Sequence, residues 1–211
     1  MTILAHRGLW KNTSEKNTVA AIKSALVCGY GFESDIRDFC GNLVISHNVA
    51  DATCRPAEEV FSLMEEFNDR YCFAVNIKSD GLKDLLLNCL KDHNLKNYFT
   101  FDMSVPQMVE YAEAGICYFT RQSEYEKDPV LYEKASGVWI DGFADVDWIT
   151  EELLERHIDN GKSVCIVSPE LHGRTNKDFW KRINEMNLDF SKVMLCTDTP
   201  DDAKIFFGGW M

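Results

Sequence analysis

Strand-like and helix-like segments alternate from end to end along this chain of 211 residues. Eight apolar runs have the length and composition of buried strands, and helical spacing or helix-end signals follow each of them. The strand-like runs are 3–8, 31–37, 73–78, 98–102, 116–121, 137–143, 163–168 and 192–198; the helical segments are 17–29, 57–67, 82–93, 105–115, 129–135, 147–160, 177–187 and a last one from 200. Eight such units predict an α/β protein with a (β/α)₈ barrel fold.

An open, doubly wound sheet is the alternative arrangement of such units. It would usually carry a glycine-rich phosphate loop after a strand, and no GxGxxG or GxxxxGK[ST] pattern follows any of these runs. The chain is long enough for one substantial core, and barrels commonly reach this size undivided. We therefore expect one barrel domain over residues 1–211.

The formal net charge of −12 limits the partners that the chain can bind. Nucleic-acid backbones and anionic membranes require clustered Lys and Arg, so we expect no nucleic acid and no stable membrane association. A small phosphate ester remains compatible, because a few local cations suffice for it. No apolar run approaches the ~20 residues that cross a bilayer, and no signal-peptide pattern precedes the first strand-like run. These features lead us to expect a cytoplasmic protein whose oligomeric state the sequence leaves open.

Eight cysteines are scattered along the chain without a CxxC pair. Several fall inside apolar strand-like runs, such as SVCIVS and VMLCTD. Buried free thiols behave as small hydrophobic groups, so the pattern favours reduced core cysteines over disulfides.

Titratable side chains gather at the ends of the first strand-like runs. His6 lies near the end of the first run, Glu33 and Asp35 lie in the second, and His47 follows a short apolar run after it. Alternate residues of a strand face the same side, so the two acids should point together. A barrel of this kind places its chemistry at the C-terminal ends of its strands. Two imidazoles beside paired carboxylates suit metal- and acid/base-assisted cleavage of a phosphodiester.

Each of these features alone also has a structural explanation. An HRG sequence can simply end a strand, paired acids can form salt bridges, and a histidine after an apolar run can be an ordinary surface residue. Their joint order and spacing favour the catalytic interpretation. Of the remaining histidines, we expect His157 to be a solvated helical residue and His93 to interact with a helix dipole.

Six short motifs resemble, in the same order, those of the glycerophosphodiester phosphodiesterase family. The family carries HRG, NT, ExD, HD, ExK and TDxP. The corresponding segments here are HRG at 6–8, NT at 17–18, ESD at 33–35, HN at 47–48, NIK at 76–78 and TDTP at 197–200. The resemblance implies metal-dependent hydrolysis of a small phosphodiester, with His6 and His47 as the acid/base pair. One histidine would activate the attacking hydroxyl, in the family the substrate's own glycerol hydroxyl, and the other would protonate the leaving alkoxide.

The resemblance also implies a metal site and a phosphate site. Glu33, Asp35 and Asn76 would hold a divalent ion, Mg²⁺ or Ca²⁺, which prefers oxygen ligands. Arg7 and Lys78 would steady the phosphate.

Three features depart from the family pattern. Asn76 stands where an acid is expected, and Asn48 stands where Asp is expected. Only a short segment separates His47 from the next helix, where the family usually inserts a cap. We therefore expect a wide, shallow active site and a substrate that differs from a simple glycerophosphodiester.

A second group of polar residues follows later strand-like runs. It comprises Asp102, Arg121, Glu124, Asp141, Glu170, His172 and Arg174. We expect Arg121 and Glu170 to bind substrate, and the alternative for the whole group is a network of salt bridges. Two other functions stay open. One is a barrel that binds a phosphorylated ligand but has lost efficient catalysis through Asn76. The other, disfavoured by charge, is a phospholipase-like enzyme that acts on lipid headgroups.

Overall fold

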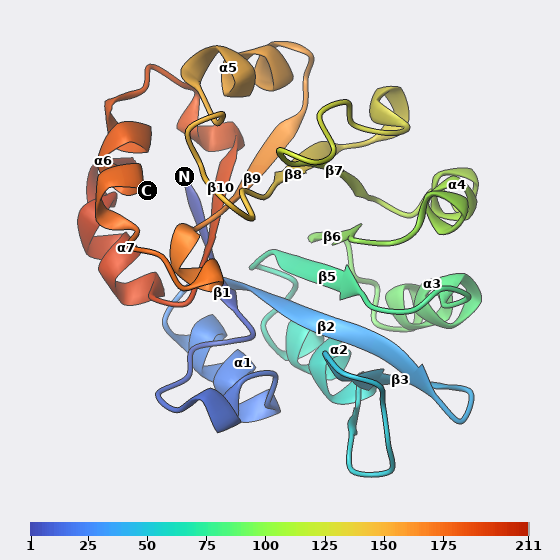
Figure 1. Cartoon of the computed structure of the whole chain (residues 1–211). Coiled ribbons are helices and arrows are strands. Elements are labelled where there is room, and N and C mark those ends of the chain that lie inside the picture. Colours follow the sequence, from blue (N-terminus) through green and yellow to red (C-terminus); the bar gives the residue numbers. More distant parts are fainter. Residues whose placement is uncertain (211) are drawn as a thin grey trace. The chain divides into compact units, whose positions relative to one another are not determined.

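The computed structural model of the protein describes residues 1–210. The chain forms two compact units. The N-terminal unit is Ala5–Tyr118, and the C-terminal unit combines Met1–Leu4 with the chain from Phe119 onward. Strands and helices alternate through both units, as the sequence predicts (Figure 1).

The N-terminal unit contains the end of β1 and the next five strands. Its elements are β1 (Thr2–His6), η1 (Thr13–Glu15), α1 (Val19–Val27), β2 (Gly31–Phe39), β3 (Asn42–Ile45), β4 (Arg55–Pro56), α2 (Glu58–Glu66), β5 (Phe73–Ile77), α3 (Lys83–Asp92), β6 (Tyr98–Phe101) and α4 (Val105–Ala114). Strand β2 pairs in parallel with β5, which pairs in parallel with β6. The C-terminal part of β2, from Ile36 to Phe39, forms an antiparallel hairpin with β3, as Figure 1 shows.

The C-terminal unit contains four consecutive parallel strands. Its elements are β7 (Phe119–Gln122), η2 (Tyr132–Lys134), β8 (Gly137–Ile140), α5 (Glu151–Asp159), β9 (Ser163–Val167), η3 (Pro169–His172), α6 (Lys177–Glu185), η4 (Phe190–Lys192), β10 (Val193–Thr197), α7 (Pro200–Phe206) and η5 (Gly208–Trp210). The order of pairing is β10, β9, β8, β7. In neither unit does a helix among residues 1–210 have both the length and the apolar character that a membrane span requires.

Aromatic residues join β2, β5 and α2 in the core of the N-terminal unit. Phe32 and Phe73 are register partners, and their rings stack with centroids 4.5 Å apart. Phe61 of α2 meets Phe73 edge-on at 5.9 Å. All three side chains are fully buried. Burial on both faces explains why these strands have near-continuous apolar runs rather than alternating ones.

Several element boundaries differ from the expected ones. The strand expected from residue 116 begins at Phe119, and the helix expected over 129–135 is only the 3₁₀ turn η2. The helix expected from residue 147 begins after Thr150, whose side chain accepts a hydrogen bond from the amide of Leu153 at 3.3 Å. Apolar periodicity marks the body of a helix, whereas a capping side chain decides where it starts.

The segment between β3 and α2 is short, as expected. Over residues 46–57 it contains only the two-residue strand β4. No cap-sized insertion follows His47 in the described chain, and the side chain of His47 is exposed.

Candidate active site

Asp35 lies at the centre of a polar cluster in the N-terminal unit. Its side chain is fully buried in β2, which would be costly for a charge without partners. The guanidinium Nε of Arg7 lies 2.9 Å from Asp35 Oδ2, and the ammonium of Lys78 lies 3.5 Å from Oδ1. The two residues expected to steady a phosphate are therefore both ion-paired with one predicted metal ligand.

Glu33 lies two residues earlier on the same face of β2 and is also buried. Its Oε2 accepts a hydrogen bond from the Arg7 amide at 3.2 Å and lies 3.9 Å from His6 Nε2. Burial, and then the charge of Asp35, raise the pKa of Glu33, while the nearby cations act in the opposite direction. The predicted common orientation of the two acids is confirmed, because Arg7 contacts both of them.

The turn after β1 brings His6 and Arg7 to these acids. Arg7 and Gly8 both have positive φ, at 58° and 89°. A Cβ on Gly8 would lie 2.6 Å from the backbone carbon of Ala21 in α1, so only glycine permits this close approach. The Arg7 amide also donates to the Glu33 carbonyl at 3.0 Å, and the Trp10 indole donates to the His6 carbonyl at 3.0 Å. The HRG sequence therefore encodes a specific tight turn.

Asn17 is the residue of this cluster whose role the sequence did not reveal. Its Nδ2 donates to Asp35 Oδ2 at 2.7 Å, while its Oδ1 accepts from the Ser34 hydroxyl at 2.9 Å. Its backbone has a φ of 61°, a conformation that Asn tolerates better than most residues. The neighbouring Thr18 caps α1 by accepting from the Ala21 amide. Thr18 thus begins the helix, and Asn17 fixes the carboxylate of Asp35 by a hydrogen bond.

Asn76 lies in β5, next to β2, and Lys78 directly follows the end of that strand. Asn76 is the register partner of Asp35, so the two side chains occupy one row of the sheet. Lys78 extends beyond Asp35 to a second acid, since its Nζ also lies 3.2 Å from Asp102 Oδ2. The prediction that Lys78 lies beside the paired acids is confirmed.

Three buried oxygens of this cluster have no hydrogen-bond partner. They are Glu33 Oε1, Asp35 Oδ1 and Asn76 Oδ1. Buried polar atoms without partners are uncommon and call for an explanation. Carboxylate and amide oxygens are the donors that Mg²⁺ and Ca²⁺ prefer, so the set fits a hard divalent cation. Within residues 1–210 no three His, Cys, Asp or Glu side chains form a metal-binding group, so a cation here would need the Asn76 amide.

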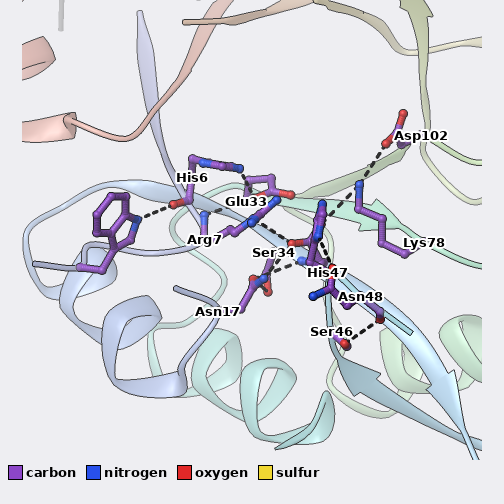
Figure 2. A network of polar contacts seen from close by, with 12 residues as sticks. His6, Arg7, Asn17, Glu33, Ser34, Ser46, His47, Asn48, Lys78 and Asp102 are labelled. Atoms are coloured by element: carbon purple, nitrogen blue, oxygen red, sulfur yellow. Dashed lines mark hydrogen bonds and ion pairs between the residues drawn. The ribbon is translucent and has the colours of Figure 1, made fainter. Parts of the chain in front are cut away.

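His47 lies beyond the end of β3, on a loop. Its exposed ring has Nδ1 3.1 Å from Asn48 Oδ1, and the Ser46 hydroxyl donates to the Asn48 carbonyl at 2.8 Å. His6, by contrast, lies beside buried Glu33 (Figure 2). The pairing of His6 with His47 across a substrate stays a prediction.

The polar residues of the C-terminal unit form their own network. Arg121 binds both carboxylate oxygens of Glu126, through Nε at 3.1 Å and Nη2 at 2.8 Å. Glu170 accepts from the Asp198 amide at 3.2 Å and from the hydroxyls of Ser168 and Thr197. The Arg121 contacts match the salt-bridge alternative, whereas the contacts of Glu170 are hydrogen bonds to uncharged donors. A substrate-binding role for Arg121 and Glu170 remains a prediction and would require them to exchange these partners.

A further ion pair in this unit joins His172 to Asp141. His172 Nε2 lies 2.6 Å from Asp141 Oδ1, and the nearby Arg174 donates to the Gly142 carbonyl. The expectation that His157 is solvated is wrong. Its ring is buried between the Tyr132 hydroxyl, 2.9 Å from Nδ1, and Gln122 Oε1, 2.8 Å from Nε2.

Comparison with solved structures shows that the chain has an α/β barrel fold. The similar structures are glycerophosphodiester phosphodiesterases. One from Parabacteroides distasonis has a TM-score of 0.69 at 15% identity and covers 100% of this chain and 98% of that one. One from Agrobacterium tumefaciens str. C58 has a TM-score of 0.64 at 15% identity, covering 95% and 97%. A glycerophosphoryl diester phosphodiesterase from Parabacteroides distasonis has a TM-score of 0.73 at 12% identity, covering 100% and 87%.

This likeness confirms the predicted fold class along the whole chain. No protein-family profile matches the chain, and a search of curated proteins finds no match. At 12–15% identity the structural likeness shows the fold alone. The chemistry therefore has to be argued from the side chains.

Proposed function

We propose that the protein hydrolyses small phosphodiesters of the glycerophosphodiester type, with a divalent metal ion and His/His acid–base catalysis. One observation supports this most directly. The three buried oxygens without hydrogen-bond partners belong to Glu33, Asp35 and Asn76, the predicted metal ligands. They lie beside Arg7 and Lys78, the cations suited to a phosphate.

Glu33, Asp35 and Asn76 would hold the ion, which we propose is Mg²⁺ or Ca²⁺. When bound, such an ion neutralises phosphate charge and polarises the phosphorus–oxygen bonds. The protein's own cations would act on the same charge. Arg7 and Lys78 now neutralise Asp35, and both have partly exposed side chains that could turn toward a phosphate. Positioned charges of this kind stabilise a transition state because they need no reorganisation during the reaction.

His6 and His47 would move the protons. His6 Nε2 lies 3.9 Å from Glu33 Oε2, so the carboxylate is placed to orient the ring. We propose that His6 protonates one alkoxide oxygen. His47 is exposed and therefore accessible to a substrate hydroxyl, and we propose that it removes the proton from this hydroxyl as the hydroxyl attacks phosphorus. The bond from phosphorus to the leaving alkoxide breaks in the same step, and water then opens the cyclic phosphate to complete the hydrolysis.

Hydrolysis of bis(p-nitrophenyl) phosphate and of glycerophosphocholine tests the proposal. Purified protein should cleave at least one of them with added Mg²⁺ or Ca²⁺, and excess EDTA should stop the reaction. His6→Asn and His47→Asn should each lower kcat by about 10²-fold or more, the usual contribution of a general acid or base. His93→Gln is the matched control, because His93 pairs with Glu58 and Glu65 outside this cluster. Full activity in EDTA would contradict the metal role.

A binding protein for a phosphorylated ligand is the second candidate. The observation that favours it is the lack of a third carboxylate at position 76, in a cluster where two cations already neutralise Asp35. Such a protein would bind glycerol phosphate or inorganic phosphate in calorimetry and turn over neither diester. Arg7→Gln would then abolish binding, while His47→Asn would leave it intact.

A further inference from the structure

We infer that Asp102 supplies the negative charge that position 76 lacks, and that it does so by holding the ammonium of Lys78 away from Asp35. This inference rests on the proposed metal site of Glu33, Asp35 and Asn76. Asp102 would be a positioning residue that acts through Lys78 and does not touch the ion.

The first observation is the position of the Lys78 ammonium between two carboxylates. Its distance to Asp102 Oδ2 is 3.2 Å, and its distance to Asp35 Oδ1 is 3.5 Å. Asp102 makes a hydrogen bond with this ammonium, whereas Asp35 Oδ1 remains without a hydrogen-bond partner. The lysine is therefore shared between the two acids, and because its hydrogen bond goes to Asp102, Asp35 Oδ1 keeps its hydrogen-bonding capacity for another cation.

The second observation is the backbone of Asp102. It directly follows β6, and its φ of 73° lies in the left-handed region that few residues other than glycine, Asn and Asp adopt. Phe101 is the register partner of Asn76, so a continuing strand would turn residue 102 to the opposite face. Lys78, two residues after Asn76, belongs to the first face. The left-handed turn brings the Asp102 carboxylate back to it.

The third observation is the balance of charge. Without Asp102, the two acids of β2 are matched by Arg7 and Lys78, and an approaching divalent ion would meet no excess of negative charge. Asp102 takes up the charge of Lys78, so the carboxylates of Glu33, Asp35 and Asp102 outnumber the Arg7 and Lys78 cations by one. The side chain of Asp102 is 32% exposed, so its effect is screened but not removed. By neutralising Lys78, an acid outside the ligand shell can thus make up for a charge that the ligand shell lacks.

A double-mutant cycle tests whether Asp102 acts through Lys78. Mn²⁺ and Mg²⁺ affinities would be measured by calorimetry, without substrate, for the wild type, Asp102→Asn, Lys78→Met and the double variant. Asp102→Asn should weaken the affinity about fivefold or more, since Lys78 would then pair fully with Asp35. In the Lys78→Met background the same change should matter less than about twofold. Asn is tolerated in the left-handed backbone conformation of residue 102. Equal Tm values of the wild type and Asp102→Asn in EDTA would show that the fold is intact.

Asp84→Asn is the charge-matched control. Asp84 lies on α3 with an 84% exposed side chain paired with Lys83, so its loss should leave the metal affinity unchanged. An equal effect of Asp102→Asn in both Lys78 backgrounds would overturn the inference, because Asp102 would then act directly on the ion. An unchanged affinity in Asp102→Asn would overturn it as well.

Failure of this inference is distinguishable from failure of the proposed function. Metal-dependent hydrolysis by the wild type, with no effect of Asp102→Asn on metal affinity, would sink the inference alone. The expected binding pattern in a protein without hydrolytic activity would support the inference and contradict the enzymatic proposal.

Discussion

Asn17 and Asp35 are joined by two hydrogen bonds that run in opposite directions. The Asn17 amide nitrogen donates to Asp35 Oδ2 at 2.7 Å, and the Asn17 amide oxygen accepts from the Asp35 backbone nitrogen at 3.3 Å. One side chain thereby restrains both the backbone and the carboxylate of a buried acid. This restraint leads to the first prediction.

Asn17→Ala should destabilise the protein by about 1.5–3 kcal/mol, because buried Asp35 loses a charge-assisted hydrogen bond. Urea unfolding measures the change. Alanine also meets strain at the φ of 61°, so Asn17→Gly is the companion variant, which removes the side chain without that strain. Asn42→Ala, at an exposed position of β3, is the control. If Asn17→Gly were as stable as the wild type, the hydrogen bonds of the Asn17 side chain would contribute nothing to stability.

Asn76→Glu should tighten Mg²⁺ or Ca²⁺ binding at least several-fold in calorimetric titration. One unit charge ~4 Å from another is worth about 4 kcal/mol at an effective dielectric near 20, before desolvation offsets much of it. A third buried acid should also destabilise the metal-free protein. The difference in Tm between the protein with metal and the protein in EDTA should therefore increase. Asn42→Glu adds the same charge at an exposed site and should change neither quantity. Weaker binding by Asn76→Glu would mean that the ligand set is wrong.

Gly8→Ala should destabilise the protein more than Gly41→Ala does. Both glycines have positive φ, at 89° and 78°, and share a strain cost of about 1–3 kcal/mol. Only at Gly8 would the new Cβ meet backbone, 2.6 Å from the Ala21 carbon, while nothing lies within 4 Å of the one at Gly41. Overpacking adds about 1–3 kcal/mol. Equal midpoints of urea unfolding for the two variants would argue against the tight turn before α1.

Acid should destabilise the protein through His157. Burial, and then the charge of Arg156, lower the pKa of His157 to about 4 from an ordinary value of 6.5. The unfolded chain takes up this proton near pH 6.5 and the folded chain only near pH 4, so stability falls as the pH drops between these values, by up to about 1.4 kcal/mol per unit. The free energy of unfolding of the wild type relative to His157→Gln should therefore decrease over that range and level off below it.

His93→Gln is the control, because the pH dependence of stability due to His93 should have the opposite sign. Burial lowers the pKa of His93, but hydrogen bonds to Glu65 and Glu58 and their charges raise it more, so it lies above 6.5. The stabilisation by His93 is fully present below about pH 6.5 and is lost as the pH rises through the higher folded value. Parallel pH profiles for the two histidine variants would contradict both assignments.

The eight cysteines should all react in a thiol titration of protein denatured under exclusion of air. All eight are free thiols in the structure. In the native protein, exposed Cys28 and Cys40 should react first, and buried Cys165 and Cys196 should react only on unfolding. Burial raises the pKa of Cys72 to about 12, so this thiol should also be slow. A count near zero in the denatured protein would show that they are oxidised. The expectation of core cysteines holds for Cys165 and Cys196, whereas Cys28 and Cys40 are exposed.

The sequence predicted those parts of the molecule that depend on local pattern. Apolar runs and helix signals indicated the alternation of strands and helices, and strand periodicity placed Glu33 and Asp35 on one face. The burial of His157 was missed because its partners Tyr132 and Gln122 are distant in sequence, while its helix is mostly polar. The left-handed turn at Asp102 was also missed, because it depends on a contact between neighbouring strands. Local periodicity carries no information on such pairings.

The row formed by Asp35 and Asn76 bears on how easily this site could change over evolution. Because the two positions are register partners on adjacent parallel strands, position 76 already points the way a third acid would have to point. Gaining or losing that carboxylate requires one residue and no rearrangement of the backbone. The sheet fixes the positions of the ligands, whereas the residue at position 76 sets how strongly they attract a cation. The affinity for the metal ion can therefore change in a lineage while the fold stays the same.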